Sequence, residues 1–123
     1  MEKVLTIGNK QVKFKSTAGT MMRYRNYFHR DFIKDLVRLQ EKFKERKKTG
    51  EDFELIDLEI FERISWCMVK TADSEIPDIE HWLDEFDSFD IMMILPEILD
   101  LLINNMATLN VTKKKINQQK KSK

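Results

Sequence analysis

The strongest constraint on the fold is a stripe of apolar residues that recurs at steps of three or four in the first half of the chain. Its members are Met21, Tyr24, Phe28, Phe32, Leu36, Leu39 and Phe43. This spacing places all of them on one face of an α-helix. Thr20 is a suitable N-cap, and the charged run 44–48 followed by Gly50 is typical of a helix end. The sequence therefore predicts one long helix between Thr20 and Gly50.

A β-hairpin is predicted before this helix. Two short runs alternate apolar or β-branched residues with polar and charged ones, and their alternating members are Val4, Thr6, Val12 and Phe14. Between the runs, Gly8-Asn9 is a two-residue turn of the type that accommodates positive φ. Because two strands alone are marginally stable, the hairpin must either pack on the helices of its own chain or pair with another chain.

A second helix and a short third one are predicted in the middle of the chain. Asp52 is a suitable N-cap for the second helix, whose buried stripe is Leu55, Leu58, Phe61, Ile64 (or Ser65) and Met68. Further apolar surface on this helix comes from Trp66, Cys67 and Val69. Pro77 suits the first turn of the short helix, which carries Ile79, Trp82, Leu83 and Phe86.

The last predicted helix begins after Asp87 or Ser88. Its apolar residues are Phe89, Met92, Met93, Leu95, Ile98, Leu99, Leu102 and Met106. Pro96 either kinks this helix or opens a new one after a break. After about residue 108 the apolar signal stops, and a segment rich in Lys, Asn and Gln cannot bury enough surface to order itself.

The predicted fold class is mainly α. With 123 residues the chain can build one modest core. We expect a single helical domain over residues 1–108, with an N-terminal β-hairpin in residues 1–16 followed by four or five packed helices. A flexible, disordered, basic tail is expected over residues 109–123.

The residues that carry chemistry are few. Cys67 is the only cysteine, which excludes a disulfide within the chain, and its apolar neighbours indicate a buried small hydrophobe. His29 and His81 stand about fifty residues apart, and the carboxylates of residues 80–90 are interrupted by apolar residues and lack the glycine of a calcium loop. The chain has no Gly-rich phosphate loop and no nucleophile elbow. We therefore expect no enzyme, no catalytic residue, no metal and no cofactor.

Membrane insertion and secretion are not expected either. The N-terminus lacks the apolar core of a signal peptide. The richest apolar run, from Ile91 to Met106, is broken by Pro96, Glu97 and Asp100 and is too polar to span a bilayer. Together with the single cysteine, these features favour a reducing cytoplasm.

Charge is distributed unevenly along the chain. Residues 1–50 carry a net charge of +9, residues 51–100 carry −14, and residues 101–123 carry +6, although the whole chain has only +1. The blocks either pair within the monomer or with solvent, or they drive head-to-tail self-association. Nucleic-acid binding is disfavoured because the acidic block repels phosphates and the aromatic residues of the basic helix lie mostly on its core stripe.

The apolar residues exceed what a small core needs, which indicates a protein partner. Methionine side chains can re-pack around varied sequences, and aromatic side chains add contact area. For each candidate the alternative is ordinary core packing. The candidates for partner contact are Tyr27, Trp66, Met68, Trp82, Phe86, Met92 and Met93.

Five stretches of the sequence resemble a known family. The hairpin and the start of the long helix, VLTIGNKQVKFKSTAGT and RYRNYFHRDFIKDL, come first. ISWCMVKTAD, IPDIEHWLDEF and FDIMMILPEIL follow in the same order and spacing as in the tail assembly chaperones of long-tailed phages and prophages of Gram-positive bacteria. The resemblance covers about residues 3–105. It consists of hydrophobic signatures and includes no catalytic motif.

This resemblance implies a function in tail morphogenesis. Such chaperones coat the tape measure protein in the host bacterial cytoplasm before the tail tube polymerises around it, and they are absent from the mature virion. A longer, frameshifted form often recruits the tail tube protein, and oligomeric assembly is known in the family. The alternative from the residues alone is a small regulatory or adaptor protein that binds another phage or host protein.

Overall fold

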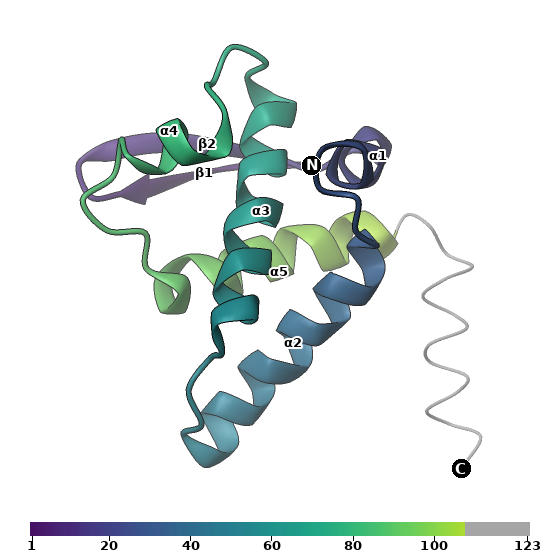
Figure 1. Cartoon of the computed structure of the whole chain (residues 1–123), viewed down its shortest axis with the longest axis vertical. Coiled ribbons are helices and arrows are strands. Elements are labelled where there is room, and N and C mark those ends of the chain that lie inside the picture. Colours follow the sequence, from purple (N-terminus) through teal and green to yellow (C-terminus); the bar gives the residue numbers. More distant parts are fainter. Residues whose placement is uncertain (108–123) are drawn as a thin grey trace.

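The computed structural model describes the backbone of residues 1–107 and the side chains of residues 1–103 (Figure 1). An N-terminal hairpin is followed in this part of the chain by five helices, which confirms the predicted fold class. The predicted tail over residues 109–123 lies outside the described residues. The elements are β1 (Glu2–Ile7), β2 (Lys10–Lys15), α1 (Ala18–Phe28), α2 (Phe32–Thr49), α3 (Leu55–Ala72), α4 (Ile79–Leu83) and α5 (Ile91–Ala107).

The hairpin packs on the helices of its own chain. β1 and β2 are antiparallel with Leu5 opposite Val12, and Gly8 takes a positive φ of 64° in the turn. One face of β2 lies on α3 and buries Val12 and Phe14 completely or nearly so. This packing supplies the apolar contact that two isolated strands lack.

Helix α3 is the centre of the domain. It contacts β2 and each of the other four helices of the described chain. Six consecutive residues, Ile64 to Val69, are buried, so this part of the helix is covered all round. A helix enclosed in this way needs apolar residues all round. Trp66, Cys67 and Val69 provide them outside the predicted stripe.

The prediction of one long first helix is wrong, because the chain breaks between α1 and α2. His29 ends α1 in the left-handed conformation (φ 55°), and its N–H donates to the carbonyl of Arg25 at 2.8 Å. Asp31 then starts α2 by accepting a hydrogen bond from the backbone N–H of Lys34 at 3.1 Å. The apolar stripe continues through the break because both helices bury it in the same core. Periodicity therefore could not reveal the break.

Several predicted helix ends also differ. Thr17 caps α1, whereas Thr20 lies inside the helix and accepts from the N–H of Thr17 in a capping box. Glu54 is the N-cap of α3, while Asp52 forms an ion pair with Arg46.

The first turn of α3 turns a different face to the core than predicted. Leu55 and Leu58, expected in the buried stripe, are exposed, whereas Asp57 is buried and pairs with Arg38 of α2. The core positions of this helix begin at Ile60 and Phe61.

The last two helices begin later in the sequence than predicted. α4 begins at Ile79, two residues after Pro77, and ends before Phe86. α5 begins at Ile91, where the carboxylate of Asp90 accepts from the N–H of Met92. The backbone stays helical through Pro96, so this residue opens no new helix. Phe86 and Phe89 lie in the connection between the two helices and pack on Trp82.

Candidate protein-binding groove

Three of the seven residues proposed for partner contact are buried, and the structure corrects their assignment. Met68 lies in the enclosed part of α3, and Trp66 is buried beside it with its indole N–H donating to the carbonyl of Pro77 at 2.9 Å. Trp82 is covered by Phe86 and Phe89, whose ring centroids lie 5.2 and 5.3 Å from its own. These side chains belong to the core and are not available to a partner.

The other four residues reach the surface to different degrees. Tyr27 is 56% exposed, Met92 37% and Met93 69%, and Phe86 is half-buried. Tyr27 packs edge-on against Trp66 at 4.9 Å, and the sulfur of Met92 accepts from the guanidinium of Arg46 at 3.2 Å. These four residues therefore pack on different parts of the core and do not form one continuous surface.

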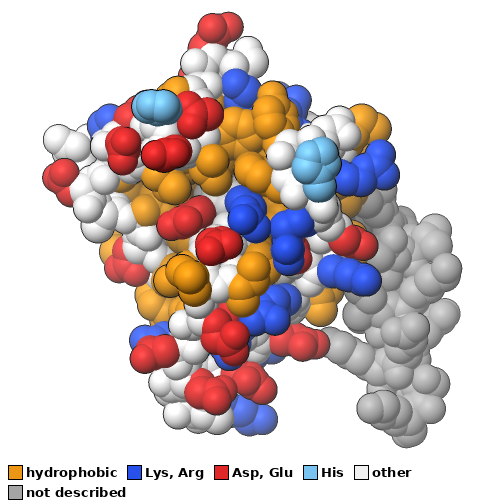
Figure 2. Space-filling view, in the orientation of Figure 1, with side chains coloured by type: hydrophobic (Ala, Val, Ile, Leu, Met, Phe, Trp, Pro, Cys, Tyr) orange, Lys and Arg blue, Asp and Glu red, His pale blue; other side chains and the backbone are white. Residues whose placement is uncertain are grey.

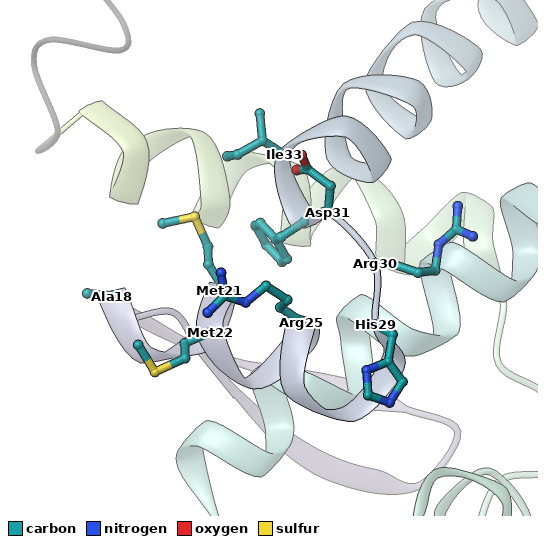
Figure 3. A pocket seen from close by; sticks show the side chains of 9 residues that line it. Ala18, Met21, Met22, Arg25, His29, Arg30, Asp31 and Ile33 are labelled. Carbon is teal, nitrogen blue, oxygen red and sulfur yellow. The ribbon is translucent and has the colours of Figure 1, made fainter.

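A groove lies between α1 and the start of α2. Its volume is about 730 Å³. It is lined by Met21, Met22 and Arg25 from α1, by His29 and Arg30 from the turn, and by Asp31, Phe32 and Ile33 from the start of α2 (Figure 3). None of the seven sequence candidates lines it.

The lining of this α1–α2 groove is apolar on its inner side. Phe32 is buried, and Met21 and Ile33 are half-buried against the core. Met21 extends from α1 into the groove, whereas Met22 lies at the outer edge of the groove and is 59% exposed (Figure 3). Flexible thioethers at an open edge can adapt to the side chains of a partner.

The polar rim of the groove has one uncommitted cation. Arg25 is exposed and forms no ion pair with any carboxylate of the described residues. Arg30 is held by Asp35 in a two-point contact of 2.7 and 2.9 Å. Asp31, which supplies the carboxylate in the lining, already accepts the capping hydrogen bond of α2. The capping hydrogen bond leaves the negative charge of Asp31 in place, so the rim carries one unpaired cation, Arg25, and one exposed carboxylate, Asp31.

The walls of the groove are fixed by a buried hydrogen-bond network. The hydroxyl of Tyr24 on α1 donates to the carboxylate of Asp35 on α2 at 2.6 Å. Burial raises the pKa of Tyr24, and the hydrogen bond to Asp35 raises it further. Burial alone would raise the pKa of Asp35, but the hydrogen bonds from Arg30 and Tyr24 outweigh it and the pKa lies below its usual value. Asp35 therefore stays ionised. Its contacts with Tyr24 and Arg30 connect the start of α2 to α1 and to the turn between the helices.

Two side chains considered as candidates for catalysis or metal binding, Cys67 and His81, lie outside the groove. Cys67 is buried in α3, and burial raises the pKa of its thiol to about 12, so the nucleophilic thiolate is suppressed. His81 lies on α4 beside Asp78, whose hydrogen bond raises the pKa of the imidazole. Within residues 1–103 no three His, Cys, Asp or Glu side chains are grouped so that they could hold a metal ion.

The uneven charge is partly balanced within the monomer. Lys3 pairs with Glu97, Lys10 with Glu85 and Arg38 with Asp57, so part of the basic block neutralises part of the acidic block within the monomer. Acidic side chains nevertheless gather over α4 and its flanking segments (Figure 2). Exposed members without a Lys or Arg partner in the described residues include Asp73, Glu75, Glu80, Asp84 and Asp87.

Comparisons with known proteins give no match: no family model, no curated protein and no solved structure matches this chain. Among the described residues, no helix is both long and apolar enough to cross a bilayer.

Sequence reasoning missed the α1–α2 groove because the groove depends on the helix break. The available signal was the adjacent pair Met21-Met22, in which only one residue can belong to a core stripe.

Proposed function

We propose that this protein is a tail assembly chaperone of a long-tailed phage or prophage of Gram-positive bacteria, and that it binds and shields the tape measure protein before the tail tube polymerises. The proposal rests on the sequence resemblance over residues 3–105. The structural observation that supports it best is the α1–α2 groove, which combines an apolar lining, exposed Met22 and the free cation of Arg25. Such a surface suits binding to a protein and not catalysis.

The other partners follow from the same proposal. A longer, frameshifted form recruits the tail tube protein, and the chaperone acts in the host bacterial cytoplasm and is absent from the mature virion. Copies associate with one another along the tape measure protein. The unpaired carboxylates around α4 and the exposed lysines at the end of α2, such as Lys44 and Lys48, give opposite charges for such contacts.

Co-expression with the tape measure protein of the same phage genome tests this function. We expect the tape measure protein to be found in the pellet after centrifugation when it is expressed alone, and in the supernatant with this chaperone. The matched control is an unrelated small helical protein expressed at the same level. A tape measure protein that stays in the pellet, beside folded and soluble chaperone, would contradict the proposal and favour an adaptor that binds another protein.

A further inference from the structure

We propose that residues 1–28, called here the N-terminal arm, exchange between two copies of this chain while α1 and α2 join into one continuous helix. The product is a closed, domain-swapped dimer in which each copy gives its arm to the other. The chain itself defines the partner, because the surface that the arm covers in the second copy is the one that it covers in its own. The inference does not depend on the proposed function.

The N-terminal arm is a unit that packs mainly on α3. Both β2 and α1 contact this helix, and Phe14 of β2 is fully buried. The ring of Tyr27 lies edge-on against Trp66 with centroids 4.9 Å apart. Only residues 29–31 connect the arm to α2. An arm that moves to a second copy therefore regains the same contacts there.

The sequence across the break between α1 and α2 is that of a single helix. There is neither Gly nor Pro from Thr20 to Thr49. The break places His29 at a φ of 55°, a conformation that is unfavourable for a residue with a Cβ. A continuous helix relieves this strain and adds backbone hydrogen bonds across the break. The apolar stripe keeps its helical spacing through it, with Tyr24, Phe28, Phe32 and Leu36.

The geometry makes the exchange intermolecular. Tyr24 and Asp35 are 11 residues apart and hydrogen-bonded at 2.6 Å in the bent monomer. In a continuous helix the same residues are separated by about 16 Å along the axis. The helix can therefore straighten only when the arm leaves its own chain. The arm of a second copy then covers the exposed part of α3, and Tyr24 of one copy donates to Asp35 of the other.

The residues of the break set the balance between monomer and dimer. Arg30 holds the bend through its two hydrogen bonds to Asp35, and the capping carboxylate of Asp31 also favours it. His29 opposes the bend. Because association has an entropic cost, the monomer is favoured in dilute solution and the swapped dimer at high concentration.

The test uses a matched pair of substitutions in the full chain, His29→Ala and His29→Gly. His29 is exposed, so neither substitution removes a core contact. Ala favours the continuous helix, whereas Gly adopts positive φ without strain and weakens a helix interior. Each dimer contains two breaks, so the effect counts twice. The dissociation constant of the dimer should be at least about a hundredfold lower for His29→Ala than for His29→Gly, with the wild type between them.

Analytical ultracentrifugation measures these constants after each sample has reached a constant mass, and circular dichroism checks that each variant is folded. The concentrations extend to about 1 mM, the weakest affinity that the experiment needs to detect. Equal dissociation constants for the two variants, or a His29→Ala variant that stays monomeric at the highest concentration, would overturn the proposal.

Nuclear Overhauser effects between chains distinguish the swapped dimer from two unopened monomers side by side. The dimer of His29→Ala is prepared from equal amounts of ¹³C-labelled and unlabelled chain, mixed as monomers. An isotope-filtered spectrum should show the contact between the Tyr27 ring of one chain and the Trp66 indole of the other. A dimer in which this contact is found only within chains would overturn the proposal.

Salt separates arm exchange from contact between surface charges. The arm covers α3 mostly with buried apolar side chains, so the dimer should keep its mass in about 1 M NaCl, where the Debye length is about 3 Å. A dimer that dissociates at this salt concentration would instead be held by opposite charges on the two surfaces, and the proposal would be wrong.

Discussion

The hydroxyl of Tyr24 donates a hydrogen bond to the carboxylate of Asp35 at 2.6 Å and so ties α1 to the first turn of α2 across the break at His29. Both residues are buried. Arg30, from the turn between the helices, completes the network with two hydrogen bonds to the same carboxylate. The geometry of the α1–α2 groove therefore depends on a polar contact in the core, and not only on apolar packing.

Removal of the Tyr24 hydroxyl should destabilise the domain. Tyr24→Phe leaves the buried Asp35 with one donor fewer, and we expect the free energy of unfolding to fall by about 1–2 kcal/mol. Urea denaturation followed by circular dichroism measures it. Tyr27→Phe is the control: its hydroxyl makes no hydrogen bond within the described residues, and its effect should stay below about 0.5 kcal/mol. Equal effects of the two substitutions would contradict the role given to the Tyr24–Asp35 contact.

Asp35 should also make stability depend on pH. Its folded-state pKa lies below the ordinary value, so in acid the unfolded chain binds more protons than the folded one. Its contribution is complete above the unfolded pKa of about 3.9 and is lost as the pH falls through the folded pKa. The difference in unfolding free energy between wild type and Asp35→Asn should therefore be largest near neutral pH and shrink below about pH 4. A difference that grows on acidification would contradict this assignment.

Cys67 should be inert in the folded protein. Its side chain is fully buried in α3, and burial raises the pKa of its thiol to about 12. Ellman's reagent should react with no thiol in native buffer and with one thiol per chain in denaturant. Rapid labelling of the native protein would show that the centre of α3 opens easily and that the core assignment is wrong.

His29 should tolerate glycine better than a β-branched residue. Its φ of 55° lies in the left-handed region, which costs a residue with a Cβ about 1 kcal/mol and a β-branched residue more. We expect His29→Gly to keep or raise the melting temperature and His29→Val to lower it, both measured by thermal denaturation. A stabilising His29→Val would indicate that α1 and α2 form one continuous helix in solution.

The elements that depend on local pattern were predictable from the sequence. Alternation and Gly8-Asn9 identified the hairpin, and periodicity identified the helical stretches. The break at His29 was missed because the stripe from Tyr24 to Phe32 keeps its helical spacing across it. Only the capping side chain of Asp31 indicates the new helix.

The candidate site was less predictable, because exposure is a property of the packed chain. Trp66 and Tyr27 are both aromatic residues on predicted helices, yet α3 is enclosed and hides Trp66, while Tyr27 lies over it at the surface. The groove itself forms where two helices diverge at a turn. A sequence pattern that predicts one straight helix contains no such feature.

The mass of the complex with the tape measure protein tests the central claim most directly. Purified complexes would be measured by size-exclusion chromatography with light scattering, for the full tape measure protein and for a version with half of its helical region deleted. A chaperone that coats its partner should be present in several copies per tape measure chain, and the copy number should fall roughly by half in the shortened complex. A single copy in both complexes, or no complex with folded chaperone, would contradict the account.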